Sequence, residues 1–256
     1  MRPADELREA VETYIRALAF APELGGLDNV LRYTLESGGK RVRPVLCLAV
    51  AEANRASVED ALPAAGALEI VHTFSLVHDD LPALDDDDER RGRPSAHVAF
   101  GEGVALLAGD ALLAEAVRLA LSYESSKIAR ELLEATLGMI GGQYRDVTGD
   151  DGDLEGLHRL KTGRLFVAAV RLGLEVAGVT EQERAPWLAF GDEVGLLFQV
   201  VDDLLDGDGY ADRLGHDGAS RLADEVAGRA RAHLDELEVD TSVLRELVDA
   251  LAVRTG

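Results

Sequence analysis

The chain has 256 residues, of which 47% are apolar, and 26 Lys and Arg stand against 48 Asp and Glu for a formal net charge of −22. This length allows one large domain or two small ones, and the apolar content is too high for wholesale disorder. So negative a charge disfavours nucleic acid and anionic lipid as partners, and no uninterrupted apolar run reaches the roughly 18 residues of a membrane anchor.

The cysteine content and the first residues indicate the cellular compartment of the protein. The single cysteine, Cys47, leaves no internal disulfide and permits a reducing compartment, which we expect to be the cytoplasm. Residues 1–15 are amphipathic and contain acidic side chains, unlike a secretory signal.

Apolar residues recur at helical spacing from the N-terminus onward, first at Leu7, Val11, Ile15 and Leu18. Short segments that break the helical pattern separate it from later ones, as at residues 21–26, 53–57 and 177–182. Only 5% of the residues are aromatic, and the apolar set is mostly Ala and Leu, which favours helix over strand. We therefore predict an all-α fold of about ten helices in one domain over residues 1–256.

The first basic cluster lies in the segment GGKRVRP at residues 38–44, where Lys40, Arg41 and Arg43 come just before Pro44. Pro44 is the expected first residue of a helix. Cations are unfavourable at a helix N-terminus because the helix dipole is positive there. Their clustering indicates an anion bound between them.

An apolar helix over residues 67–80 is predicted to end in acid, in the segment HDDLPALDDDDERRGRP. Asp79 and Asp85 would point roughly 120° apart on a regular helix, at about 100° per residue. Pro82 prevents a regular helix, so the chain bends near Leu81 and can bring Asp85 back toward Asp79.

A second acidic cluster ends another strongly apolar helix, in FQVVDDLLDGD. Asp202 and Asp206 are four residues apart and therefore share a face, with Asp203 beside them. A lone DDxxD is most often a solvated helix face, but the apolar neighbours indicate burial, and buried carboxylates require partners.

Two aspartate clusters that face each other would be unstable without cations. Mg²⁺ suits carboxylate ligands and completes its shell with water and phosphate oxygens, so the clusters predict a metal and a phosphorylated substrate. Arg90 and Arg91 follow the first cluster directly, and Lys161 and Thr162 interrupt an otherwise apolar helix. Each basic residue alone is most often a surface charge, but together they fit two anions, one bound through metal and one bound by side chains.

Six motifs taken together resemble the trans-isoprenyl diphosphate synthases. They are GGKRVRP, HTFSLVHDDLPALDDDDERRGRPSAH, FGEGVALLAGDALL, GGQYRDV, KTGRLF and GLLFQVVDDLLD, and they occur in order over about residues 25–210. The resemblance implies the isoprenoid synthase fold, a helical bundle around a central cavity. It also implies a prenyltransferase in which an allylic diphosphate ionises and isopentenyl diphosphate attacks the cation, with the released diphosphate accepting the proton.

The resemblance assigns roles residue by residue. Up to three Mg²⁺ ions would bridge the allylic diphosphate to the aspartates, and Lys161 would act at the reacting centre. The implied metal ligands are Asp79, Asp85 and Asp202, supported by Asp80, Asp203 and Asp206. The implied isopentenyl diphosphate contacts are Lys40, Arg43, His72 and Arg91, and the implied allylic contacts are Arg90, Lys161, Thr162 and Gln199. Without the resemblance, His72 would be read as an ordinary core histidine.

Product length is predicted from Phe74, five residues before Asp79 and about 7.5 Å back along a helix axis. In the family an aromatic here is commonly a floor that stops growth at fifteen carbons, and smaller residues at this position let the chain lengthen. Thr73 and Ser75 are small, so Phe74 is the only bulky candidate in this turn. Farnesyl diphosphate is the expected product and geranylgeranyl diphosphate the alternative, unless Phe74 is ordinary core.

The chain departs from the family after Asp206. The family usually carries a longer loop with lysines that close over the diphosphate, whereas residues 207–225 contain no lysine. His216 lies near where a lysine is expected, with Arg213 and Arg221 close by. This departure affects the residues that in the family support lid closure and the third metal.

Three other functions remain open on the sequence alone. A non-catalytic subunit of a heteromeric synthase typically lacks an aspartate motif, and this chain keeps both. A terpene cyclase needs no second diphosphate site, which the basic residues disfavour. A calcium-binding bundle is disfavoured because residues 206–215 lack the ligand spacing of an EF-hand. The resemblance also implies a homodimer.

Overall fold

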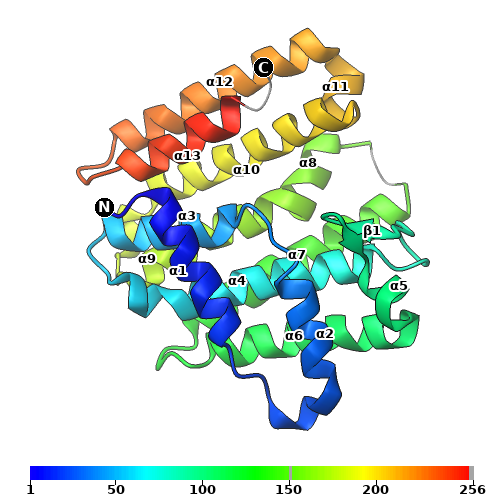
Figure 1. Cartoon of the computed structure of the whole chain (residues 1–256). Coiled ribbons are helices and arrows are strands. Elements are labelled where there is room, and N and C mark those ends of the chain that lie inside the picture. The colour runs from blue at the N-terminus through cyan, green and yellow to red at the C-terminus, as the bar shows by residue number, and fades with distance from the viewer. Residues whose placement is uncertain (150–151, 254–256) are drawn as a thin grey trace.

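The computed structural model describes residues 1–149 and 152–253, and it confirms the all-α prediction (Figure 1). The predicted domain also includes residues 150–151 and 254–256, which lie outside the described part. The elements are, in order, α1 (Ala4–Ala17), η1 (Pro22–Leu27), α2 (Asp28–Leu35), α3 (Val42–Ala53), α4 (Val58–Asp79), β1 (Glu89–Arg90), β2 (Arg93–Pro94), α5 (Ala96–Phe100), α6 (Glu102–Ala120), α7 (Lys127–Val147), α8 (Leu154–His158), η2 (Arg159–Gly163), α9 (Arg164–Val176), η3 (Glu181–Glu183), α10 (Ala185–Asp206), α11 (Gly209–Leu214), α12 (His216–Asp235) and α13 (Ser242–Ala252).

The predicted number of helices is close, since ten described α-helices have eight or more residues and three are shorter. The sequence did not predict the antiparallel hairpin β1–β2, in which Glu89 pairs with Pro94 and Arg90 with Arg93. Helix α3 begins at Val42 rather than at the predicted Pro44. Among the described residues, no helix is both long enough and apolar enough to cross a bilayer.

Helix α4 is the central element because it is apolar on nearly every side and is buried along most of its length from Val58 to Val77. Figure 1 shows α6 on one side of it, and α10 with α12 and α13 on the other. Small residues permit close packing: a Cβ on Gly109 of α6 would overlap the His78 ring of α4, and a Cβ on Gly173 of α9 would lie 2.6 Å from the Cys47 carbonyl oxygen of α3. One apolar core runs from Leu7 in α1 to Leu251 in α13.

The two acid-bearing helices end differently. Helix α10 ends at Asp206. The next residue, Gly207, takes a left-handed φ of 77° that suits glycine, and its N–H donates to the Asp203 carbonyl oxygen at 2.8 Å. Helix α4 stops at Asp79, just before the turn that contains Pro82. Both ends open on the same side of the bundle.

Candidate functional site

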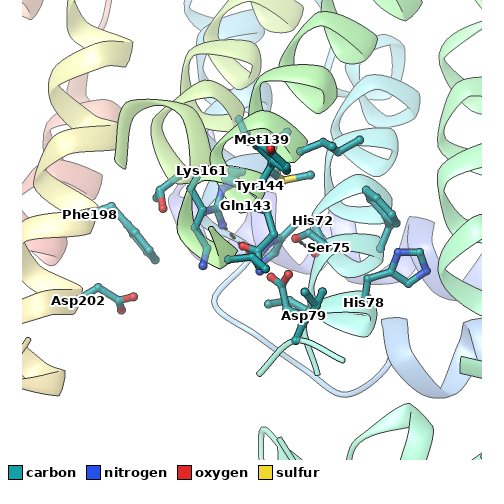
Figure 2. Close-up of a pocket in the computed structure, with 18 residues that line it drawn as sticks. His72, Ser75, His78, Asp79, Met139, Gln143, Tyr144, Lys161, Phe198 and Asp202 are labelled. Atoms are coloured by element: carbon teal, nitrogen blue, oxygen red, sulfur yellow. Dashed lines mark hydrogen bonds between the residues drawn. The ribbon is translucent and has the colours of Figure 1, made fainter. Parts of the chain in front are cut away.

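A cavity of about 570 Å³ opens between α4, α7, η2, α9 and α10. Figure 2 shows Asp79 and Asp202 facing this space from two different helices, with Lys161 between them. The walls are mostly apolar. The lining residues are Arg43, His72, Phe74, Ser75, Leu76, His78, Asp79, Leu84, Met139, Ile140, Gln143, Tyr144, Val147, Lys161, Thr162, Leu165, Phe198 and Asp202.

The turn after α4 brings Asp85 back to Asp79, as predicted from Pro82. The Asp85 N–H donates to the Asp79 carbonyl oxygen at 2.9 Å, and Asp86 takes a left-handed φ of 54°. Burial raises the pKa of Asp79 to about 6, the Asp85 and Asp80 charges add to this rise, and Lys161 opposes it. The Asp79 carboxylate therefore occupies a position that a cation would stabilise.

Asp80 points away from the cavity, although it is the neighbour of Asp79. It is 3% exposed and accepts a hydrogen bond from Nε of Arg90 at 2.9 Å. Arg90 also pairs with Asp87 at 2.8 Å. Both Asp80 and Arg90 thus have protein partners outside the cavity, where they tie the β1–β2 hairpin to the end of α4.

The second aspartate cluster divides in the same way. Asp202 lines the cavity, and its pKa is raised by burial and then by the Asp206 and Asp203 charges. Asp206 is exposed one turn later on the same helix. Asp203 is 3% exposed and accepts hydrogen bonds from Nε2 of Gln199 at 2.6 Å and from the Tyr210 N–H at 2.8 Å. Asp202 is therefore the aspartate of this cluster whose side chain lines the cavity.

Lys161 and Thr162 sit on η2, a π-helical turn that joins α8 to α9. Such turns are common at functional sites because they redirect side chains without ending a helix. Lys161 forms an ion pair with Asp146 of α7, and the Thr162 hydroxyl donates to Oε1 of Gln199 at 2.6 Å. A Cβ on Gly142 would lie 2.5 Å from the backbone nitrogen of Lys161, so α7 needs glycine there to approach η2.

Arg43 and His72 form the basic wall of the cavity. Nη1 of Arg43 lies 3.5 Å from Nε2 of His72, and the guanidinium stacks over Phe166 at 4.4 Å and Phe198 at 5.2 Å. Nε of Arg43 is buried without a hydrogen-bond partner. Burial lowers the pKa of Arg43 to about 10, and burial followed by the Arg43 and Arg91 charges lowers the pKa of His72. A buried donor without a partner is what a bound anion would satisfy.

The other predicted anion contacts lie outside the cavity lining. Arg91 donates to the Gly38 carbonyl oxygen, next to Lys40 in the glycine-rich loop. Arg41 is wholly engaged elsewhere: it pairs with Glu12 at 2.7 Å and with the buried Glu69. The prediction that Arg41 belongs to an anion-binding cluster is therefore wrong, because two carboxylates already neutralise it.

The lysine-free segment after α10 contributes no side chain to the cavity lining. His216 is exposed at the start of α12, and neither Arg213 nor Arg221 reaches the lining. Tyr210 of α11 instead packs edge-on against the His158 ring at 5.4 Å between centroids.

One wall of the cavity was missed by the sequence analysis. Helix α7 contributes Met139, Ile140, Gln143, Tyr144 and Val147, and both side-chain amide atoms of Gln143 are buried without partners. The only signal was GGQYRDV, whose glycine permits the close approach to η2. In α4, Phe74 and Ser75 do line the cavity, with the Phe74 ring edge-on to His78 at 5.1 Å.

The donor set fits Mg²⁺ only in combination with other oxygen ligands. Within residues 1–149 and 152–253, no three Asp, Glu, His or Cys side chains come together as a preformed metal site. Asp79 and Asp202 nevertheless offer two carboxylates to one cavity. Mg²⁺ is commonly held by one or two carboxylates plus substrate phosphates and water, so these residues fit that ion.

Comparison with known proteins agrees with this geometry. The sequence profile described as polyprenyl synthetase matches residues 25–225. The farnesyl diphosphate synthase of Bacillus subtilis is 35% identical over 262 residues, covering 89% of this chain and 88% of the relative. The geranylgeranyl diphosphate synthase of Cyanophora paradoxa is 43% identical over 192 residues, covering 69% and 64%. The crystal structure of a geranyltransferase from Legionella pneumophila superposes with a TM-score of 0.88 at 31% identity, covering 98% and 96%.

Proposed function

The chain belongs to the polyprenyl synthetase family, and we propose that it condenses isopentenyl diphosphate with dimethylallyl or geranyl diphosphate to give farnesyl diphosphate. The carbon–oxygen bond of the allylic substrate breaks, and the double bond of isopentenyl diphosphate attacks the resulting cation. The condensed carbocation then loses a proton from the isopentenyl unit to form the new double bond, and the departing diphosphate takes up that proton. The observation that carries this proposal is the cavity itself, where Asp79 and Asp202 face Arg43 and His72.

The allylic diphosphate would lie at the aspartate end. Asp79 and Asp202 would hold Mg²⁺ together with Asp85 and Asp206 at the rim, and Lys161 would reach the same anion. Mg²⁺, when bound, neutralises the charge that develops on the leaving diphosphate. Asp80 and Asp203 would support this arrangement without ligating, because each already has protein partners. By resemblance to the family, three ions would be bound.

The isopentenyl diphosphate would lie against the basic wall. Arg43 offers a buried guanidinium whose Nε has no partner, and His72 adjoins it. Lys40 and Arg91 of the neighbouring loop would close over this diphosphate. A terpene cyclase needs no such second anion site, so the basic wall favours the condensing reaction.

The apolar depth of the cavity would receive the growing chain and keep the cation away from water. Phe74 lines this depth and favours a fifteen-carbon product. A geranylgeranyl product is the second candidate, because the similar proteins include geranylgeranyl as well as farnesyl synthases.

A second copy of the chain is the proposed partner. The α7 stripe, which we define as Leu133, Leu137, Ile140, Tyr144 and Val147, is apolar and 41–70% exposed. Three of its residues, Ile140, Tyr144 and Val147, also line the cavity. A homodimer through this stripe would both cover the apolar surface and complete a wall of the cavity. The proposed location is the cytoplasm, which suits the free, buried Cys47.

The direct test is incubation of the pure protein and Mg²⁺ with isopentenyl diphosphate and, separately, dimethylallyl, geranyl or farnesyl diphosphate. Chromatography of the products should show farnesyl diphosphate from the first two substrates and little extension of the third. Extension of farnesyl to geranylgeranyl diphosphate would instead establish the second candidate. No product from any pair would reject prenyl transfer by this chain alone.

A further inference from the structure

A chain of three hydrogen-bonded side chains runs from the cavity wall into the protein. The hydroxyl of Thr162, which lines the cavity, lies 2.6 Å from Oε1 of Gln199, and Nε2 of Gln199 lies 2.6 Å from Oδ1 of Asp203. The chain links η2 to α10 and ends at a carboxylate that is 3% exposed.

The chemistry of the carboxylate sets the direction of every bond in this chain. An ionised carboxylate only accepts, so the Gln199 amide must turn its NH₂ group toward Asp203. The amide oxygen then faces Thr162, which must donate its single hydroxyl hydrogen to it. The Thr162 oxygen is left with lone pairs, and no hydrogen, to present to the cavity.

Asp203 is held so that it cannot turn toward the cavity. Its Oδ2 accepts from the Tyr210 N–H at 2.8 Å, and Nδ1 of His158 lies 3.9 Å from the same oxygen. Gly209, with a φ of +47°, permits this approach, because a Cβ at that position would overlap Oδ2. Both carboxylate oxygens are therefore engaged by the protein, in contrast to Asp202 one residue earlier.

We propose that Asp203 is a positioning residue: through Gln199 it orients the Thr162 hydroxyl so that only oxygen lone pairs face the reacting carbons. The inference deepens the proposed function and rests on it, since an allylic cation is the species that would form beside Thr162. A fixed dipole aimed with its negative end at developing positive charge lowers the barrier without reorganisation. The reversed dipole would raise it.

The substitution Asp203→Asn tests the direction of the chain without changing its shape. The introduced asparagine must keep its oxygen on the Tyr210 N–H, so its NH₂ group faces Gln199 and forces that amide to turn over. The Gln199 NH₂ group then donates to Thr162, whose hydrogen rotates out toward the cavity. We expect kcat to fall about tenfold or more, as when one aligned dipole is lost from a reaction site. The Mg²⁺ concentration at half-maximal rate should stay unchanged.

The double variant Gln199→Glu/Asp203→Asn supplies the rescue. The introduced glutamate accepts from both the introduced asparagine and Thr162, so Thr162 donates inward again, and the total charge equals that of the wild type. We expect kcat of the double variant to exceed that of either single variant. Gln199→Glu alone places two carboxylates face to face and should be poor. If Asp203→Asn does not fold, the double variant is compared with Gln199→Glu instead, and a folded double variant whose kcat is no higher than that of Gln199→Glu overturns the inference.

Three results would overturn the inference. The first is wild-type kcat in Asp203→Asn, and the second is a folded double variant no better than Asp203→Asn. The third is a raised Mg²⁺ requirement in Asp203→Asn that matches the one in Asp202→Asn, the control at a proposed ligand. A wild-type protein that forms no prenyl product would instead overturn the proposed function, and the inference with it.

Discussion

Arg43 is the basic group at the site best placed to bind an anion, because it is buried, lies against the rings of Phe166 and Phe198, and has an Nε without a hydrogen-bond partner. Charge-assisted contacts to phosphate contribute about 1.5–3 kcal/mol each. We expect Arg43→Ala to raise the KM for isopentenyl diphosphate about tenfold or more, and the KM for the allylic substrate much less. Steady-state kinetics with each substrate varied in turn measures both constants. Equal effects on the two would argue against separate anion sites.

Asp79 should destabilise the protein when it is ionised and no metal is present. Its pKa is raised from 3.8 to about 6, so the folded state binds this proton more tightly than the unfolded state does. The resulting loss in the free energy of unfolding is absent below about pH 4, grows as the pH rises to about 6, and is constant above that. It reaches about 1–3 kcal/mol for a partly solvated group.

The variant Asp79→Asn cannot ionise there and escapes this loss. In EDTA, its free energy of unfolding relative to wild type should therefore increase from pH 4 to pH 6 and then level off. Urea unfolding at a series of pH values gives this difference. Parallel curves across the range would show that the pKa of Asp79 is not raised.

The residues that sequence reasoning placed well are those whose geometry is local. Pro82 after an apolar helix was enough to predict the return of Asp85 to Asp79. The roles of neighbouring aspartates are harder to predict from the sequence, because tertiary partners such as Arg90 and Gln199 decide which aspartate faces the cavity. Residues one apart on a helix point about 100° from each other, so the pattern alone does not show which of the two faces the cavity.

At the scale of elements, α4 supplies both the metal end and the depth of the cavity. Phe74 is 7% exposed, lines the cavity and packs edge-on against His78, which is itself fixed 3.1 Å from the Leu106 carbonyl oxygen of α6. We expect Phe74→Ala to lengthen the product to twenty carbons or more. Because the lost volume joins an existing cavity, the stability cost should stay below the roughly 3–5 kcal/mol of a sealed Phe→Ala site.

Chromatography of the products and thermal unfolding together test this role of Phe74. Ser75→Ala is the matched control, since it lies beside Phe74 on the cavity wall and leaves its ring in place. An unchanged fifteen-carbon product with a large loss of stability would mean that Phe74 is ordinary core.

The contribution of α7 to the cavity could not be predicted from the sequence, because Met139 and Gln143 at helical spacing are typical of any amphipathic helix.

For the whole molecule, the α7 stripe predicts how two copies associate. A stable dimer buries about 800 Å² on each partner, and Leu137 is the stripe residue most exposed after Tyr144, at 68%. Leu137→Glu should shift the protein from dimer to monomer in sedimentation velocity. Leu214→Glu on α11, 51% exposed in the wild type, is the control that should leave the dimer intact. A Leu137→Glu variant that remains dimeric would place the interface elsewhere.

The central claim is that Asp79 of α4 and Asp202 of α10 act together on one metal-bound diphosphate. The most direct measurement is the rate of prenyl product formation as a function of Mg²⁺ concentration for wild type, Asp79→Ala and Asp202→Ala, with circular dichroism to check the fold. Both variants should stay folded and lose turnover by orders of magnitude, because each loses a ligand whose effect is largest in the transition state. Near-normal turnover of either variant at saturating Mg²⁺ would contradict the account.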